Sequence, residues 1–243
     1  MKIGILATGI TPDELINEYG SYADMFVQLF QQSGHAFEYQ VYDVRDGQFP
    51  GGATDCDGWI ITGSKFNVYQ NLPWMQQLKT LILDIHRAER PLVGICFGHQ
   101  IVADAFGGQV DKYSGGWGVG LHSYEVKPAF DFLKGAPSSF CISAMHQDQV
   151  LTKPDNAEVF ATSDFCSYAG LVYDDRIMTF QAHPEFSISY ENKLITLRKG
   201  DVIPDETAEL ALAMVNDKDA ETDSVMVAHW MADFLRQRAP EAG

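Results

Sequence analysis

Short apolar runs alternate with longer amphipathic segments along the first part of the chain. Apolar runs that stop at glycine or at a polar turn are typical of buried strands, and apolar residues that recur every three or four positions are typical of helices. The pattern predicts strands at 2–7, 37–42, 58–62 and 92–95. It predicts helices at 12–32, 72–89 and 101–106. Thr11 is expected to cap the first helix, with Pro12 at its first position.

The order of these elements predicts a parallel sheet. Nearly continuous apolar strands that alternate with helices are typical of a sheet covered by helices on both faces. Because crossovers between parallel strands are right-handed, we expect a doubly wound α/β fold. Ligands of such folds bind beyond the carboxyl ends of the strands. Gly63 and Cys96 both follow the ends of predicted strands, so we expect them at this edge.

The second part of the chain has a different pattern. Shorter segments with alternating apolar residues predict an additional antiparallel region, with strands at 120–126, 140–145 and 158–162. A hairpin is expected between 168–173 and 176–181. From residue 187 the pattern is helical, with helices expected at 189–198, 205–215 and 224–238. We expect one domain over 1–243, with a core at about 1–186 and a helical extension at about 187–243.

Composition narrows the classes of function. The hydrophobic content of 46% and the charged content of 21% are ordinary for a globular protein, and no apolar run is long enough to cross a membrane. A net charge of −16 argues against a nucleic-acid partner, because phosphate binding needs basic patches. Four cysteines without CxxC spacing, and an N-terminus that predicts a strand rather than a signal peptide, favour a reducing cytoplasm.

A cysteine stands between two glycines where the strand at 92–95 gives way to helix, in Gly94-Ile95-Cys96-Phe97-Gly98-His99-Gln100. This is the thiol counterpart of a nucleophile elbow, whose turn is too tight for side chains beside the nucleophile. The sulfur is then expected at the N-terminus of a helix, where backbone N–H groups and the helix dipole favour thiolate over thiol. The pattern therefore predicts a nucleophilic Cys96.

A nucleophilic cysteine needs a base and a group that orients the base. His183 follows the apolar end of the hairpin and begins His183-Pro184-Glu185. Pro184 disposes His183 to an extended conformation, in which residues two apart project to the same side. The Glu185 carboxylate can therefore lie beside the imidazole and hold its tautomer, which makes His183 the leading candidate for the base.

With the Cys96 motif followed some 85 residues later by His183-Pro184-Glu185, the chain resembles the class I (triad) glutamine amidotransferases. It is most similar to stand-alone domains like the amidotransferase half of GMP synthase, and the resemblance runs from Ile3 to Glu185. Supporting segments lie at 60–64, 115–120 and 145–150. Two segments depart from the family pattern: Gly63-Ser64-Lys65 stands where Gly-Gly-Pro is common, and Met145-His146-Gln147-Asp148 stands where GMP synthases have Ser-His-Gly-Asp.

The resemblance implies a role for each candidate residue. Cys96 attacks the side-chain amide of glutamine, His183 moves the proton to the leaving ammonia, and Glu185 orients His183. Water then releases glutamate from a γ-glutamyl thioester. The oxyanion lies between the backbone N–H of Phe97 and one from the Gly63-Ser64 turn. The α-amino acid part of the substrate is held by Gln100 and by the backbone near His146 and Asp148.

Three functions remain open on the sequence alone. The first is a glutaminase whose ammonia passes to an acceptor on a separate synthetase subunit. The second is a hydrolase of γ-glutamyl peptides or amides, which shares the chemistry up to the thioester. The third is a binding module without catalysis, which the joint presence of Cys96, His183 and Glu185 disfavours. No cofactor is expected, and no residues have the spacing of metal ligands.

Overall fold

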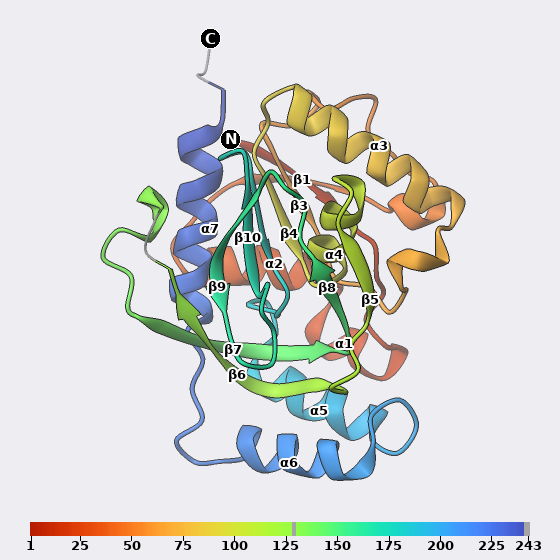
Figure 1. Ribbon diagram of the computed structural model, residues 1–243, viewed down its shortest axis with the longest axis vertical. Helices are drawn as coiled ribbons and strands as arrows, with labels where there is room; N and C mark the ends of the chain where they lie inside the picture. The colour runs from red at the N-terminus through yellow and green to blue at the C-terminus, as the bar shows by residue number, and fades with distance from the viewer. Residues whose placement is uncertain (128–129, 241–243) are drawn as a thin grey trace.

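The computed structural model describes residues 1–127 and 130–240, and its framework is one large sheet. The strands of this sheet are β1 (Lys2–Leu6), β2 (Glu38–Tyr42), β3 (Gly58–Ile61), β4 (Leu92–Ile95), β6 (Gly118–Val126), β7 (Ser139–His146), β9 (Ala157–Thr162), β10 (Gly170–Tyr173) and β11 (Ile177–Phe180). They are ordered β2-β1-β3-β4-β11-β10-β9-β6-β7 (Figure 1). A second, two-stranded sheet pairs β5 (Gln109–Lys112) with β8 (Asp148–Thr152).

The sheet has a parallel half and an antiparallel half. Strands β2, β1, β3, β4 and β11 are parallel, and β10, β9, β6 and β7 continue the same sheet in antiparallel order. The mostly parallel α/β sheet expected from the sequence is confirmed. The antiparallel strands are not a separate addition, however, because the hairpin pairs Gly170 with Phe180 and so joins them to the edge of β11.

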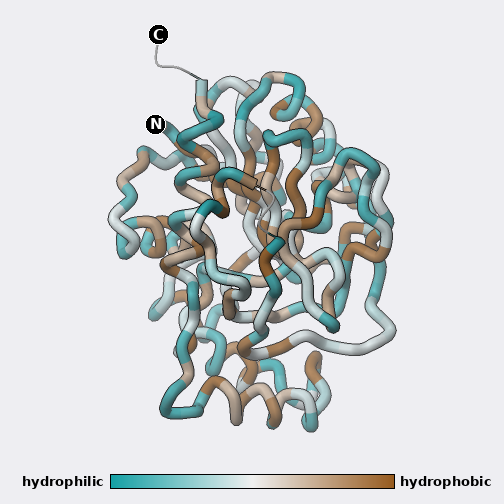
Figure 2. The backbone as a smooth tube through the Cα atoms, turned by 60° about the vertical axis from the view of Figure 1, so that its left-hand side comes forward, coloured by the Kyte–Doolittle hydropathy of each residue, from teal (hydrophilic) through white to brown (hydrophobic). Residues whose placement is uncertain are grey.

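Helices cover both faces of the parallel half. The helices of the whole fold are α1 (Asp13–Tyr19), α2 (Tyr22–Gln32), α3 (Pro73–Arg87), α4 (Phe97–Ala105), α5 (Ile188–Arg198), α6 (Asp205–Val215) and α7 (Ser224–Arg238), and four of them cover the parallel half. Helices α2 and α7 bury their apolar sides against one face, and α3 and α4 against the other. Hydrophobic stretches accordingly run through the central strands, whereas the surrounding loops are hydrophilic (Figure 2).

The helices after residue 187 are integrated into the fold. Helices α5 and α6 lie along β6 and β7 and share a third apolar cluster with α1 (Figure 1). Helix α7 belongs to the main core instead, since Val227, Phe234 and Leu235 are fully buried there. The predicted ranges 205–215 and 224–238 coincide with α6 and α7.

Two local predictions were wrong. The helix expected at 12–32 is broken into α1 and α2, because Gly20 adopts φ +74° and Ser21 starts a new helix with a capping box to Asp24. Thr11 does not cap α1: Pro12 occupies that position, and the Thr11 hydroxyl is buried without a hydrogen-bond partner among the described residues.

Two strands and one helix start were not anticipated. The paired strands β5 and β8 lie in segments for which no strand was expected. Helix α4 begins at Phe97 rather than at residue 101, so the elbow cysteine immediately precedes the helix. Over residues 1–127 and 130–240, none of the helices combines the length and the apolar character needed to cross a bilayer.

Candidate active site

Three neighbouring strands deliver the candidate residues to one edge of the sheet. Strands β3, β4 and β11 are parallel and adjacent, so their carboxyl ends meet there. The Gly63-Ser64 turn follows β3, Cys96 follows β4 and His183 follows β11. A Cβ placed on Gly63 would lie 3.7 Å from Cys96 Cβ and 2.8 Å from His183 Cε1. Segments far apart in the sequence are therefore in contact at this point.

Cys96 occupies the strained turn that its sequence predicts. It has φ +52° and ψ −101°, a region that non-glycine residues seldom adopt. The two flanking glycines are required by contact: a Cβ on Gly94 would lie 2.8 Å from the Gly98 carbonyl oxygen, and one on Gly98 would lie 2.5 Å from that of Ile61. The backbone is held by the Cys96 N–H, which donates to the Phe180 carbonyl at 2.8 Å.

The Gly63-Ser64 turn is fixed by threonines that sequence reasoning missed. The Thr8 hydroxyl lies 2.8 Å from the Thr62 carbonyl oxygen and 3.1 Å from that of Gly63. The Ser64 hydroxyl donates to the Thr8 carbonyl at 2.7 Å. Within the described residues, the backbone N–H groups of Gly63, Ser64 and Phe97 have no acceptor. These donors are available to a ligand beside Cys96.

His183 and Glu185 form a buried pair. The His183 Nδ1–H donates to Glu185 Oε1 at 2.8 Å, and the two side chains are 4% and 0% exposed. The imidazole stacks on Phe186 with ring centroids 4.0 Å apart. Burial lowers the pKa of His183, but the Glu185 carboxylate and the Cys96 side chain outweigh it and hold the pKa well above its usual value. The pair therefore favours an imidazolium next to the thiol.

A third buried ionisable group lies behind this pair. Glu191, on α5, is fully buried and accepts the Gly120 N–H at 3.1 Å. Its other carboxyl oxygen has no partner among the described residues. Burial raises the pKa of Glu191 to about 8, against the opposing effect of His183. No sequence pattern pointed to this residue, because only the packing of α5 on β6 buries it.

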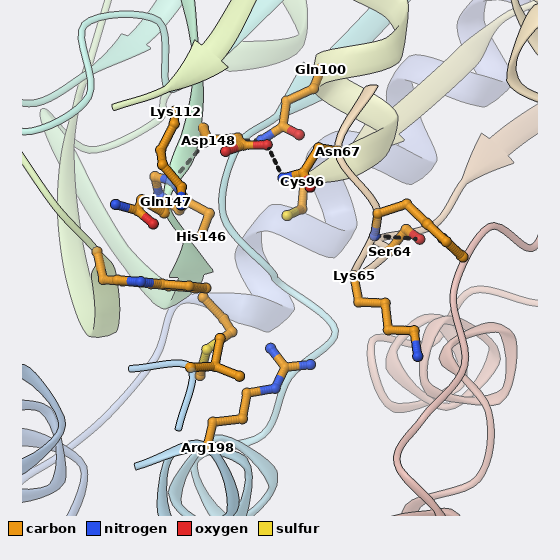
Figure 3. Close-up of a pocket in the computed structure, with 14 residues that line it drawn as sticks. Ser64, Lys65, Asn67, Cys96, Gln100, Lys112, His146, Gln147, Asp148 and Arg198 are labelled. Atoms are coloured by element: carbon orange, nitrogen blue, oxygen red, sulfur yellow. Dashed lines mark hydrogen bonds between the residues drawn. The ribbon is translucent and has the colours of Figure 1, made fainter. Parts of the chain in front are cut away.

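Cys96 faces a cavity of about 410 Å³, within the range of ligand pockets. One end of this cavity is built around Asp148, whose carboxylate accepts from Asn67 Nδ2 at 2.5 Å and from the Tyr69 hydroxyl at 3.3 Å (Figure 3). Gln100 Nε2 donates to the Asp148 carbonyl at 2.9 Å and fixes the backbone of this segment. The predicted residues Gln100 and Asp148 are thus brought together with Cys96.

The two other histidines near the site are buried and neutral. Burial, with a further contribution from His122 and His183, lowers the pKa of His146 to about 3. His146 Nδ1 lies 3.2 Å from the Asp148 carbonyl oxygen, so this ring supports the wall of the cavity. Burial also lowers the pKa of His99 to about 3, and its Nδ1 lies 2.8 Å from the Thr179 hydroxyl. His99 supports the elbow from within the core.

Three basic side chains also line the cavity, and sequence reasoning did not assign any of them to the site. Lys112 lies on the strand that pairs with Asp148, at the same end of the cavity. Lys65 follows the Gly63-Ser64 turn, and Arg198 is the last residue of α5. Arg198 also lines a smaller cavity with Cys96, Ser64 and His183. The extension after residue 187 therefore contributes directly to the site.

Comparison with known proteins places the chain in a family. The family model described as glutamine amidotransferase class-I matches residues 14–199. The chain belongs to the class I glutamine amidotransferase family. The fold agrees: a crystal structure of a glutamine amidotransferase from Thermotoga maritima superposes with a TM-score of 0.73 at 20% identity, covering 99% of each chain.

Curated relatives differ in the activity that their names state. Gamma-glutamyl peptidase 5 of Arabidopsis thaliana is 30% identical over 234 residues, which are 92% of this chain and 90% of that protein. A glutamine-hydrolyzing GMP synthase subunit of Methanococcus maripaludis is 39% identical over 101 residues, which are 41% of this chain and 53% of that protein. The first similarity includes most of the C-terminal extension in its length, whereas the second is confined to a shorter stretch.

Proposed function

We propose that this protein hydrolyses the γ-glutamyl amide bond of glutamine through a Cys96 thioester. The observation that carries the proposal is the convergence of three groups at one strand edge: a strained Cys96, the buried His183–Glu185 pair, and backbone N–H groups without acceptors within the described residues. A nucleophile, a base with its orienting carboxylate, and oxyanion donors are the parts that acyl transfer needs.

The chemistry follows from these positions. The Cys96 thiolate attacks the amide carbon, and the N–H groups of Phe97 and of the Gly63-Ser64 turn stabilise the oxyanion. Since Glu185 engages Nδ1 of His183, Nε2 is the nitrogen that transfers a proton to the leaving nitrogen as the C–N bond breaks. Water then attacks the thioester and gives a proton to His183, the C–S bond breaks, and glutamate and the thiolate are restored.

The Asp148 end of the cavity suits the α-amino acid part of the substrate. The Asp148 carboxylate can pair with the α-ammonium, and Lys112 on the neighbouring strand can pair with the α-carboxylate. Gln100 and His146 hold the Asp148 backbone in place. This arrangement gives one anion and one cation to a zwitterionic glutamyl group.

A second candidate function uses the same chemistry on γ-glutamyl peptides. The similarity to a γ-glutamyl peptidase over 92% of the chain supports it. In the glutaminase reaction the leaving group is ammonia, which a separate synthetase subunit would accept; the similarity to a GMP synthase subunit supports such a partner. In the peptidase reaction the leaving group is the amine of an amino acid or peptide, and no acceptor is needed.

Glutamate release tests the proposal. The purified chain is given glutamine and γ-glutamyl peptides in parallel, and the wild type is expected to release glutamate. Cys96→Ala should abolish release and prevent labelling by a glutamine-analogue electrophile. Cys141→Ala is the matched control, because the described hydrogen bonds of Cys141 to the Asp223 segment use its backbone. Near-normal turnover by Cys96→Ala would refute the nucleophile.

A further inference from the structure

The cavity in front of Cys96 has more positive charge than a glutamyl group can use. Its Asp148 end already offers one anion and one cation, Asp148 and Lys112, to the two charges of the α-amino acid part. Arg198 and Lys65 lie at the other end, with Cys96 between the two ends (Figure 3). Since the γ-carbonyl must reach Cys96 from the Asp148 end, these two cations face the side on which the leaving group departs.

The Arg198 side chain lines the cavity and has no ion-pair partner within the described residues. The Arg198 carbonyl accepts backbone N–H groups from Val202 and Ile203, each at 3.0 Å, which fixes the turn that follows α5. The side chain is half-buried and lines both cavities that reach Cys96. Over residues 1–127 and 130–240, no carboxylate forms an ion pair with Arg198. A partly desolvated cation without a partner is unfavourable until an anion arrives.

Lys65 adds a second charge from the opposite wall. It stands directly after the turn that carries the proposed oxyanion donors, at the position where the family pattern commonly has proline. The Lys65 side chain is exposed, and it too has no carboxylate partner within the described residues. Arg198 comes from the helical extension, so the basic end is assembled from two distant segments.

We propose that Arg198, assisted by Lys65, binds a carboxylate on the leaving group. The inference rests on the proposed hydrolysis at Cys96 and names its substrate class. Ammonia leaving from glutamine has no carboxylate, so Arg198 contributes nothing to its recognition. The amine of a γ-glutamyl amino acid bears a carboxylate two bonds from the leaving nitrogen, and a planar guanidinium binds it in bidentate fashion. The preferred substrates are therefore γ-glutamyl amino acids, whose leaving amine carries the carboxylate at this distance.

A matched set of substrates tests this recognition. The values of kcat/KM are measured for glutamine, γ-glutamyl-alanine and γ-glutamyl-alanine amide, which lacks only the carboxylate charge. The wild type is expected to prefer the acid to the amide by about tenfold to a hundredfold, as for a hydrogen bond between charged groups. Equal rates for acid and amide would overturn the inference.

Variants of Arg198 separate the carboxylate site from general effects on the fold. Arg198→Gln should remove most of the preference for the acid, and Arg198→Lys should restore part of it. Arg198→Glu should reverse the preference toward a γ-glutamyl amide whose leaving amine carries an ammonium group. Lys199→Gln is the control, since Lys199 pairs with Glu209 outside the cavity. Thermal unfolding of each variant checks that it is folded.

The outcomes distinguish failure of the carboxylate-binding inference from failure of the proposed hydrolysis at Cys96. If the wild type releases glutamate from none of these compounds, the proposed hydrolysis itself is wrong. If it hydrolyses all of them, and Arg198→Gln reduces kcat/KM for glutamine and for both alanine compounds by the same factor, the hydrolysis stands. In that case Arg198 does not recognise the leaving group, and the inference fails alone.

Discussion

Two opposing electrostatic effects set the pKa of His183 in the His183–Glu185 pair. Burial disfavours the charged imidazole, and the adjacent carboxylate reverses that preference. In Glu185→Gln burial is opposed only by Cys96, so the pKa of His183 should fall, which an NMR titration of its ring can follow. Glutamate release should fall by roughly 10²-fold or more, the usual size of a general acid–base contribution. Glu158→Gln, on an exposed position of β9, is the control. An unchanged titration would show that Glu185 does not govern the imidazole.

The buried Glu191 makes the free energy of unfolding depend on pH. Its pKa is about 8 in the folded protein against 4.5 for an unperturbed glutamate, so the folded state retains a proton that the unfolded chain loses. The free energy of unfolding therefore carries no penalty below about pH 4.5, falls as pH rises from there, and carries the full penalty near pH 8.

Glu191→Gln should remove this penalty while keeping an oxygen for the Gly120 N–H. The variant is expected to gain stability over the wild type as pH rises, with a difference on the order of a few kcal/mol at pH 8. Urea unfolding at pH 5, 7 and 8 measures the difference. Exposed Glu206→Gln should show none of it. Parallel pH curves for Glu191→Gln and wild type would mean that the carboxyl is ionised in the folded state.

The proposed nucleophile and the proposed base could be singled out in the sequence because their signals are local. Gly94, Cys96 and Gly98 stand together, as do His183 and Glu185, and the fold only had to bring two short motifs to one edge. Arg198 carries no such signal, since its place depends on where α5 docks. No local sequence pattern identifies Thr8, which supports the Gly63-Ser64 turn. Its hydrogen-bond partners follow a different strand, far along the chain.

At the scale of elements, the elbow depends on the contact between β3 and α4. Gly98, in the first turn of α4, has no room for a Cβ beside the Ile61 carbonyl of β3. Gly98→Ala should cost about 1–3 kcal/mol of unfolding free energy through overpacking and should reduce glutamate release by displacing Cys96. Gly52→Ala is the matched control, because nothing lies within 4 Å of the added Cβ. If both variants unfold alike, the contact is looser than the geometry indicates.

The agreement between predicted and observed ranges differed from element to element. The ranges of helices α6 and α7 were predicted to the residue. Strands β5 and β8 each present few apolar residues, because they pair only with each other and part of what β8 buries is polar, at Asp148 and Gln149. The sequence did indicate the break at Gly20, because Ser21 and Asp24 have the spacing of a capping box. The continuous apolar periodicity nevertheless led to the prediction of one helix.

At the scale of the whole molecule, net charge and local charge have opposite signs. The chain carries a net charge of −16, yet Lys65, Lys112 and Arg198 meet around one cavity. The composition shows that the chain is acidic, but it does not show where the basic side chains lie in the folded protein. The cavity is therefore lined by three cations and Asp148 in a chain whose net charge is strongly negative.

Removing the C-terminal helix α7 tests whether the fold depends on residues beyond the segment matched by the family model, which ends at residue 199. Helix α7 covers one face of the parallel half together with α2, and most of its inward side is buried. A chain that ends at residue 223 would expose that face of the sheet. At about 1.5–3 kcal/mol for each large buried apolar side chain of α7, the burial lost is similar to the roughly 5–15 kcal/mol by which domains are usually stable. The truncated chain is therefore expected to lose cooperative unfolding and to bind a hydrophobic dye, whereas a chain that ends at residue 240 should unfold like the full one. A cooperative transition in the shorter chain would mean that the sheet is stable without α7, and that this helix is an accessory layer.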